Sequence, residues 1–168
     1  MNRTTKVEIF KEDTDHGFLG ANQNWWFDPS FEHAFSIFDL DGFYPDQYFE
    51  ADHVNSEVVN NYVTAVLNLG QMILEREVTS ILEVGSGGGW FTEAFIKKGI
   101  DCFAIEGTKA GYDKCLARGI PEKCIMRHDV RMPIVLDRKF DMVLCTEVAE
   151  HIEPPFSSQL VEYVNCFV

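Results

Sequence analysis

The sequence lacks features that define several classes of protein. Among its 168 residues, no stretch approaches the roughly 18 uncharged apolar residues that a membrane-spanning helix requires. The opening residues, MNRTTKVEIFKEDTD, contain no apolar core of the kind found in signal peptides. We therefore predict a cytoplasmic protein with one hydrophobic core and no membrane partner.

Paired cysteines are also missing. The five cysteines form no CxxC motif, and they fall in or beside segments that favour strands and helices. Disulfide-stabilised small proteins and zinc-binding modules need cysteines in pairs or at close, regular spacing. The sequence therefore predicts free thiols and no metal site.

Positive charge is scarce, above all in the first half. The formal net charge is −13; residues 1–79 hold 4 Lys or Arg against 14 Asp or Glu, and residues 80–168 hold 10 against 13. Such a surface repels phosphate backbones and anionic headgroups. Nucleic acid is therefore not an expected partner.

The character of the sequence changes between its two parts. Residues 1–55 are polar, acidic and rich in aromatic side chains, with a turn signal at Asp28-Pro29. From Ser56 to Glu77, apolar residues recur at spacings of three and four, which predicts an amphipathic helix. Its predicted apolar positions are Val59, Tyr62, Val63, Val66, Leu67, Ile73 and Leu74. We therefore divide the chain into an N-terminal segment, residues 1–55, and a folded domain, residues 56–168.

Strand and helix signals alternate along the second part. The predicted strands are residues 80–84, 101–106, 124–129 and 140–145. The predicted helices are residues 90–98, 109–117 and 156–168. Such alternation is typical of a doubly wound, Rossmann-like α/β fold, in which a mostly parallel sheet carries helices on both faces. Folds of this class bind ligands at the carboxyl ends of their strands.

A glycine-rich loop follows the first predicted strand in ILEVGSGGGW, residues 81–90. A nucleoside triphosphate loop needs Lys followed by Ser or Thr after the glycines, and this sequence has neither. A dinucleotide fingerprint that begins at Gly85 needs a small third residue, but Trp90 takes that position. An indole there is expected to hold helix and strand apart. Both interpretations are therefore disfavoured.

Three acids mark the ends of predicted strands: Glu83, Glu106 and Asp129, at intervals of 23 residues. Parallel strands end at one edge of a sheet, so these carboxylates are expected to converge. Three acids without a basic residue among them disfavour a pyrophosphate and favour a ligand that carries an ammonium and a sulfonium. A carboxylate at Glu106 suits a ribose diol, and one at Asp129 suits an exocyclic amine. Taken singly, each acid has an alternative interpretation as a helix cap or turn residue.

With these residues in view, the chain resembles the class I S-adenosylmethionine-dependent methyltransferases. ILEVGSGGG is similar to their first motif, and FDMVLCTEVAEHIEPP is similar to their fourth strand and the loop after it. The resemblance covers about residues 45–168. It implies S-adenosyl-L-methionine as cofactor and a strand order of 3-2-1-4. It also implies that the chain lacks the last strands of the seven-stranded family fold, which leaves the fourth strand as an open edge.

The resemblance further implies roles for individual residues. Glu83 would bind the methionine amine, Glu106 the ribose hydroxyls, and Asp129 with the backbone of Val130 the adenine. The full implied set of cofactor-binding residues is Glu83, Gly85, Ser86, Gly87, Gly89, Glu106, Gly107, Asp129, Val130, Cys145 and Thr146. Where the acceptor must lose a proton, the candidate catalytic bases are His151 and Glu147, with Glu150 beside them. A capping or orienting role is the alternative for His151.

Two further questions stay open at the level of sequence. Trp25, Trp26, Tyr44, Tyr48 and Phe49 form either a lid over the crevice, as upstream segments do in the resembled family, or a cluster that fastens the N-terminal segment to the sheet. The first predicted function is methyl transfer to a small-molecule or sugar acceptor. The alternative is a non-catalytic, truncated interaction domain of the same fold that self-associates through its open edge.

Overall fold

The structure is a computed structural model, and it describes residues 40–44, 46–49, 54–152 and 154–168. Residues 41–168 form one compact unit. Most of the predicted N-terminal segment, including Trp25 and Trp26, lies outside the described residues. The fold described below is therefore that of the second part of the chain, with a short piece of the segment that precedes it.

Within the described residues, three helical elements precede the sheet. They are the short helix α2 (Leu40–Phe43), the 3-10 helix η2 (Asp46–Phe49) and the long helix α3 (Ser56–Leu74). Helix α3 begins where the Asn55 side chain accepts a hydrogen bond from the Glu57 amide at 2.8 Å. It ends before the predicted Glu77, because Glu75 adopts the left-handed conformation with φ 55°. Without a glycine at this position, the sequence carries no signal for the stop.

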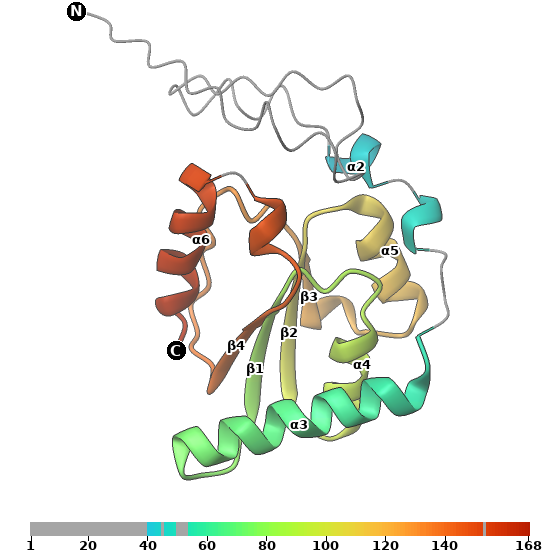
Figure 1. The fold of residues 1–168 in the computed structure, drawn as a ribbon. Helices are drawn as coiled ribbons and strands as arrows, with labels where there is room; N and C mark the ends of the chain where they lie inside the picture. The colour runs from blue at the N-terminus through green and yellow to red at the C-terminus, as the bar shows by residue number, and fades with distance from the viewer. Residues whose placement is uncertain (1–39, 45, 50–53, 153) are drawn as a thin grey trace, which may run out of the picture. The chain divides into compact units, whose positions relative to one another are not determined.

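Four parallel strands form the sheet in the order β3-β2-β1-β4, so the predicted order is confirmed. They are β1 (Ser80–Val84), β2 (Asp101–Glu106), β3 (Ile125–Arg127) and β4 (Met142–Cys145). The remaining helical elements are α4 (Trp90–Lys97), α5 (Lys109–Ala117), η3 (Glu122–Cys124), η4 (Ala149–His151) and α6 (Pro154–Asn165). Figure 1 shows the sheet between α6 on one side and α4 and α5 on the other, which confirms the doubly wound, Rossmann-like fold.

Two strands are shorter than predicted. Strand β3 ends at Arg127 rather than at residue 129, because the chain turns at Asp129, whose carbonyl accepts a hydrogen bond from the Met132 amide at 2.9 Å. Strand β4 begins at Met142 rather than at residue 140. There the carboxylate of Asp141 accepts the amides of Thr79 and Ser80, at 2.7 and 3.0 Å, and anchors the start of β4 beside β1. The last helix ends at Asn165 rather than at residue 168.

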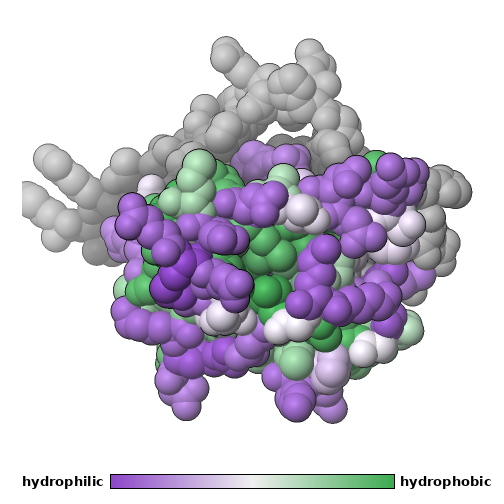
Figure 2. Space-filling view, turned by 90° about the horizontal axis from the view of Figure 1, so that it is seen from below, coloured by the Kyte–Doolittle hydropathy of each residue, from purple (hydrophilic) through white to green (hydrophobic). Residues whose placement is uncertain are grey.

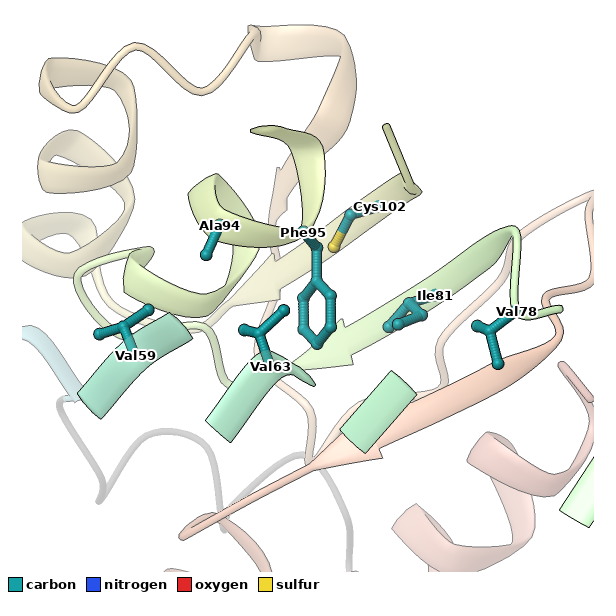
Figure 3. Close-up of a cluster of buried hydrophobic side chains, with 7 residues drawn as sticks. All are labelled: Val59, Val63, Val78, Ile81, Ala94, Phe95 and Cys102. Atoms are coloured by element: carbon teal, nitrogen blue, oxygen red, sulfur yellow. The ribbon is translucent and has the colours of Figure 1, made fainter. Parts of the chain in front are cut away.

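Side chains of β1 alternate between the two faces of the sheet. Ile81 is fully buried and packs with Val63 of α3 and Phe95 of α4, in the cluster drawn in Figure 3. Leu82 belongs to the cluster on the opposite face, together with Leu160 of α6. This alternation is the one that a strand covered on both faces requires. The two clusters fix the position of the carboxyl end of β1, where the glycine loop begins.

Part of the apolar surface of α3 faces solvent. Leu69, Met72 and Ile73 are 50, 70 and 68% exposed, although Ile73 was among the predicted apolar positions of the helix. Ile73 lies at the edge of the buried stripe that passes through Val63 and Gly70. Figure 2 views the molecule from below and shows hydrophobic surface framed by hydrophilic side chains. Among the described residues, no helix is long and apolar enough to cross a membrane.

We expect Phe95→Ala to lower the free energy of unfolding by about 3–5 kcal/mol, because it removes a fully buried ring and leaves a cavity. Urea denaturation measures the change. The control is Met72→Ala, which truncates a side chain that is 70% exposed and should cost no more than about 0.5 kcal/mol. Equal losses in the two variants would contradict the packing described here.

Candidate functional site

The glycine loop, residues 85–89, lies at the carboxyl end of β1. Gly85, Gly87 and Gly89 have φ values of 78°, 54° and 78°, in the left-handed region that favours glycine. A Cβ on Gly85 would come within 2.2 Å of Val148, and one on Gly89 within 2.5 Å of Ile120. Because these neighbouring side chains approach so closely, a side chain at position 85 or 89 would displace either the loop or the residues packed against it.

The glycine loop is hydrogen-bonded to β2 at Ser86 and less closely packed at Gly87. The amide of Ser86 donates to the Ile105 carbonyl of β2 at 3.2 Å, and its buried hydroxyl lies 3.6 Å from the Cys115 thiol of α5. At Gly87, by contrast, the nearest described atom to an added Cβ is a ring carbon of Phe49, at 3.9 Å. The more open side of the loop is therefore at Gly87.

Glu106, the last residue of β2, holds this loop in place. Its Oε2 accepts the Gly87 amide at 2.7 Å, and its Oε1 accepts the amide and hydroxyl of Thr108 at 2.9 and 2.7 Å. The Thr108 hydroxyl also accepts the Gly111 amide at 3.0 Å and so caps α5. Burial raises the pKa of Glu106 above its ordinary value, although these hydrogen bonds oppose the shift. One carboxylate thus joins β2, the loop and α5.

Glu83 lies on the same face of the sheet as Glu106, the face that helix α4 covers. It is 4% exposed, and its carboxyl group accepts a hydrogen bond from the hydroxyl of Thr92. Burial raises the pKa of Glu83 to about 7; the Thr92 hydrogen bond lowers it, and the nearby charge of Glu106 raises it. Glu83 and Glu106 are therefore close enough to repel each other, but Glu83 is covered by α4.

Asp129 lies two residues beyond the end of β3 and is paired with Arg131. Nε and Nη2 of Arg131 lie 2.9 and 2.5 Å from the carboxylate oxygens, and the Arg131 side chain is only 7% exposed. The prediction that the three acids have no basic neighbour was wrong for Asp129, because the turn folds Arg131 back onto it. The next residue in the chain, Val130, packs against the core on the α6 side.

The chain after β4 forms the opposite border of the loop. Cys145, the last residue of β4, is an exposed residue whose thiol pKa is raised by burial, and the Thr146 hydroxyl lies 3.0 Å from the Tyr62 hydroxyl of α3. Glu147 adopts a left-handed conformation with φ 55°, which is rare outside glycine and is often found at functional sites. His151 is exposed at the end of η4. The candidate bases thus lie on the segment that follows β4, with their side chains at the surface.

Asp41, in the segment upstream of α3, is bonded to residues near the carboxyl ends of the strands. Asp41 accepts the Lys109 amide at the start of α5 and contacts Nη2 of Arg127 at the end of β3, both at 2.6 Å. Burial raises the pKa of Tyr44 to about 12, with smaller contributions from Tyr48, Glu106 and Glu150. The Asp41 contacts tie this residue to α5 and β3, and both the lid and the fastening cluster of aromatic side chains stay predictions.

Several residues that shape this site were not predicted from the sequence to be site residues. They are Tyr62, Thr92, Gly111 and Arg131. Only Arg131 carried a local signal, since an Asp commonly accepts the amide two residues later and brings that residue's side chain near. The other three act across 9 to 84 residues or through packing, which no short motif records.

Comparison with known proteins bears directly on this geometry. Residues 82–163, which begin within β1 and include the glycine loop, the strand ends and most of α6, match the methyltransferase domain family. This match supports the resemblance to the class I S-adenosylmethionine-dependent methyltransferases. The matched part of this methyltransferase domain contains Glu83, Glu106, Asp129 and the loop between Gly85 and Gly89.

Individual relatives extend the comparison. A ubiquinone biosynthesis O-methyltransferase from Actinobacillus pleuropneumoniae is 32% identical over 87 residues, which are 46% of this chain and 36% of the relative. Among solved structures, an amino pentose methyltransferase from Micromonospora echinaspora has a TM-score of 0.60 at 16% identity, over 73% of this chain and 50% of that one. A sugar N-methyltransferase from Streptoalloteichus has a TM-score of 0.57 at 17% identity, over 73% and 48%. The chain thus spans about a third of the curated relative and half of these structures, which support the fold.

We expect Glu83→Gln to change how stability depends on pH. The folded pKa of about 7 lies above the ordinary value of 4.5, so between these values the folded chain keeps a proton that the unfolded chain has lost. The stability that Glu83 contributes therefore declines as pH rises from about 4.5 through about 7. Glutamine does not titrate, so the variant should gain on the order of 1–3 kcal/mol relative to the wild type between pH 5 and pH 8.

Denaturant unfolding of both proteins at the two pH values measures this difference. Glu122→Gln, at an exposed position on η3, is the control and should show no such gain. A pH-independent difference between Glu83→Gln and the wild type would contradict the assignment of a raised pKa to Glu83.

Proposed function

We propose that this chain binds S-adenosyl-L-methionine at the carboxyl ends of β1, β2 and β4 and transfers its methyl group to a small-molecule or sugar acceptor. The observation that carries the proposal is the buried carboxylate of Glu106, hydrogen-bonded to the Gly87 amide in the glycine-rich loop of the region that matches a methyltransferase domain. When bound, the cofactor supplies a methyl group on a sulfonium, which is already a strong leaving group. The protein then has to align the acceptor and exclude water.

The residues at the strand ends fit this cofactor. The more open side of the loop lies at Gly87, next to the carboxylate of Glu106. A carboxylate oxygen has two lone pairs, so in this proposal the Oε2 that holds Gly87 also accepts a ribose hydroxyl. The amide of Gly107 lies at the same strand end. Asp129, with the backbone of Val130, receives the adenine amine, and Arg131 holds Asp129 in position.

The remaining cofactor contacts come from the loop and from the end of β4. Gly85, Ser86 and Gly89 set the course of the backbone along the cofactor, and Cys145 and Thr146 border its methionyl end. For Glu83 the buried position under Thr92 favours support of the loop from beneath, in place of the direct contact with the methionine amine that the sequence predicted.

On the acceptor side, we assign proton removal to His151, with Glu147 as the second base. Both are exposed on the segment that follows β4, next to the proposed methionyl end. The similar proteins include an O-methyltransferase and methyltransferases of sugars, and these support a small hydroxyl- or amine-bearing acceptor. An acceptor hydroxyl must lose its proton during transfer, which is the role proposed for His151. A cytoplasmic location is part of the same proposal.

Titration with S-adenosylhomocysteine tests the cofactor site. We expect the wild type to bind and Glu106→Gln to bind at least about tenfold more weakly, because the amide loses the charge-assisted bonds to Gly87 and to ribose. Isothermal titration calorimetry gives both affinities. Glu122→Gln carries the same charge change at an exposed position and should bind as the wild type does. Absence of binding to the wild type, or equal affinity in all three proteins, would refute the proposed site.

A methyl-transfer assay on a panel of catechols, hydroxybenzoates and amino sugars tests the acceptor side. For an acceptor hydroxyl, we expect His151→Asn to lower kcat about 100-fold while the affinity for S-adenosylhomocysteine changes less than about twofold. Unchanged kcat in His151→Asn, with a loss in Glu147→Gln, would move the role of base to Glu147. Weaker cofactor binding with unchanged kcat would contradict both assignments.

A second function is favoured by one observation. In the described sheet, β4 pairs with β1 alone, so its other side is an edge. The alternative function is a non-catalytic, cofactor-binding interaction domain that self-associates through this edge. Cofactor binding without turnover on any acceptor, together with a dimer in native mass spectrometry, would favour this alternative.

A further inference from the structure

We propose that Gly111, in the first turn of α5, is a positioning residue that fixes the carboxylate of Glu106 and thereby the ribose subsite. The ribose part of this inference rests on the proposed function. The positional part rests on the packing between α5, Glu106 and the glycine loop, and it can be measured without any ligand.

Gly111 touches both groups that build the subsite. A Cβ at this position would lie 2.8 Å from Cδ and 2.9 Å from Cγ of Glu106, and 2.9 Å from the carbonyl oxygen of Gly87. These separations are shorter than real Cβ contacts allow, so an added methyl group must displace either the acid or the loop. Gly111 is itself buried, so there is no outward path for the methyl group.

The backbone does not require glycine at this position. Gly111 is absent from the glycines with positive φ, and it lies inside a regular helix. In a helix, alanine is intrinsically more favourable than glycine, so local propensity alone predicts that Gly111→Ala stabilises the protein. Glycine here is therefore explained by the space that Glu106 and Gly87 occupy.

Neither neighbour is free to give way. Glu106 is 5% exposed, and its oxygens are held by the amides of Gly87 and Thr108 and by the Thr108 hydroxyl. The carbonyl of Gly87 accepts a hydrogen bond from the Cys115 thiol at 3.3 Å. A methyl group at position 111 thus strains a network that spans the loop, β2 and α5, and any relaxation moves the carboxylate.

The absence of a side chain at position 111 is matched to the length of the acid at position 106. Aspartate is one methylene shorter than glutamate, so Glu106→Asp removes the Cδ that the added methyl group would approach to 2.8 Å, while a Cγ and the Gly87 carbonyl stay in place. Each single substitution should then harm the subsite, but the second should partly relieve the first. Such coupling between two positions is what a double-mutant cycle measures.

The experiment compares the wild type, Gly111→Ala, Glu106→Asp and the double variant by calorimetric titration with S-adenosylhomocysteine and its 2′-deoxy analogue. We expect Gly111→Ala to bind S-adenosylhomocysteine at least tenfold more weakly and to lose most of the wild-type preference over the deoxy analogue. The double variant should bind at least fivefold more tightly than additive losses predict. A general structural defect would weaken both ligands equally and leave the preference unchanged.

Asp113→Ala is the control on the same helix, since it alters the helix propensity of an exposed position away from Glu106. It should bind within about twofold of the wild type. If Gly111→Ala does not fold, the comparison moves to Glu106→Asp and the double variant, which must fold and bind S-adenosylhomocysteine within about twofold of Glu106→Asp. Wild-type affinity and ribose preference in Gly111→Ala, or additive losses in the cycle, would overturn the inference.

The outcomes also separate this inference from the proposed function. Failure of the wild type to bind S-adenosylhomocysteine refutes the proposed function and the ribose part of the inference. The same cycle measured by urea unfolding then decides the positional part, which requires coupling between positions 106 and 111. Binding by the wild type with no effect of Gly111→Ala refutes the inference alone.

Discussion

The carboxylate of Glu106 is the constraint on which the candidate site depends. A buried charge is costly unless hydrogen bonds compensate it, and here the donors come from the glycine loop and from the start of α5. Meeting this requirement draws three separate segments together at the end of β2. The left-handed conformations of the glycines allow the loop to turn. The hydrogen bond from the Gly87 amide to Glu106 then fixes where the loop lies.

A second set of contacts positions the other side of the site. Tyr62 of α3 reaches the Thr146 hydroxyl after β4, and its ring stacks on Phe91 of α4 with centroids 4.3 Å apart. Asp41 ties the upstream segment to α5 and β3. The strand ends are thus bordered by helices that are separated in sequence but linked by polar side chains, and loops held in this way can keep a binding geometry.

The sequence allowed the strand order, the helices on both faces and the glycine loop to be predicted, because these features follow from local periodicity and from a short motif. The chemical state of the acids could not be predicted in the same way. Their spacing of 23 residues indicated a shared edge, but only the folded chain shows that Thr92 covers Glu83 and that Arg131 pairs with Asp129. Strand ends were equally hard to predict, since β3 stops where side-chain bonds form a turn.

These local environments change the electrostatic argument for the ligand. Three ionised carboxylates would attract a cationic donor by charge alone, but Asp129 is compensated by Arg131, and burial raises the pKa of Glu83 to about 7. Burial raises the pKa of Glu106 as well, but its oxygens are directed by fixed hydrogen bonds from Gly87 and Thr108. Discrimination at this site should therefore come from the direction of hydrogen bonds at the end of β2 and less from net negative potential. A ligand with a correctly placed ribose diol satisfies that requirement, whereas a simple cation of equal charge does not.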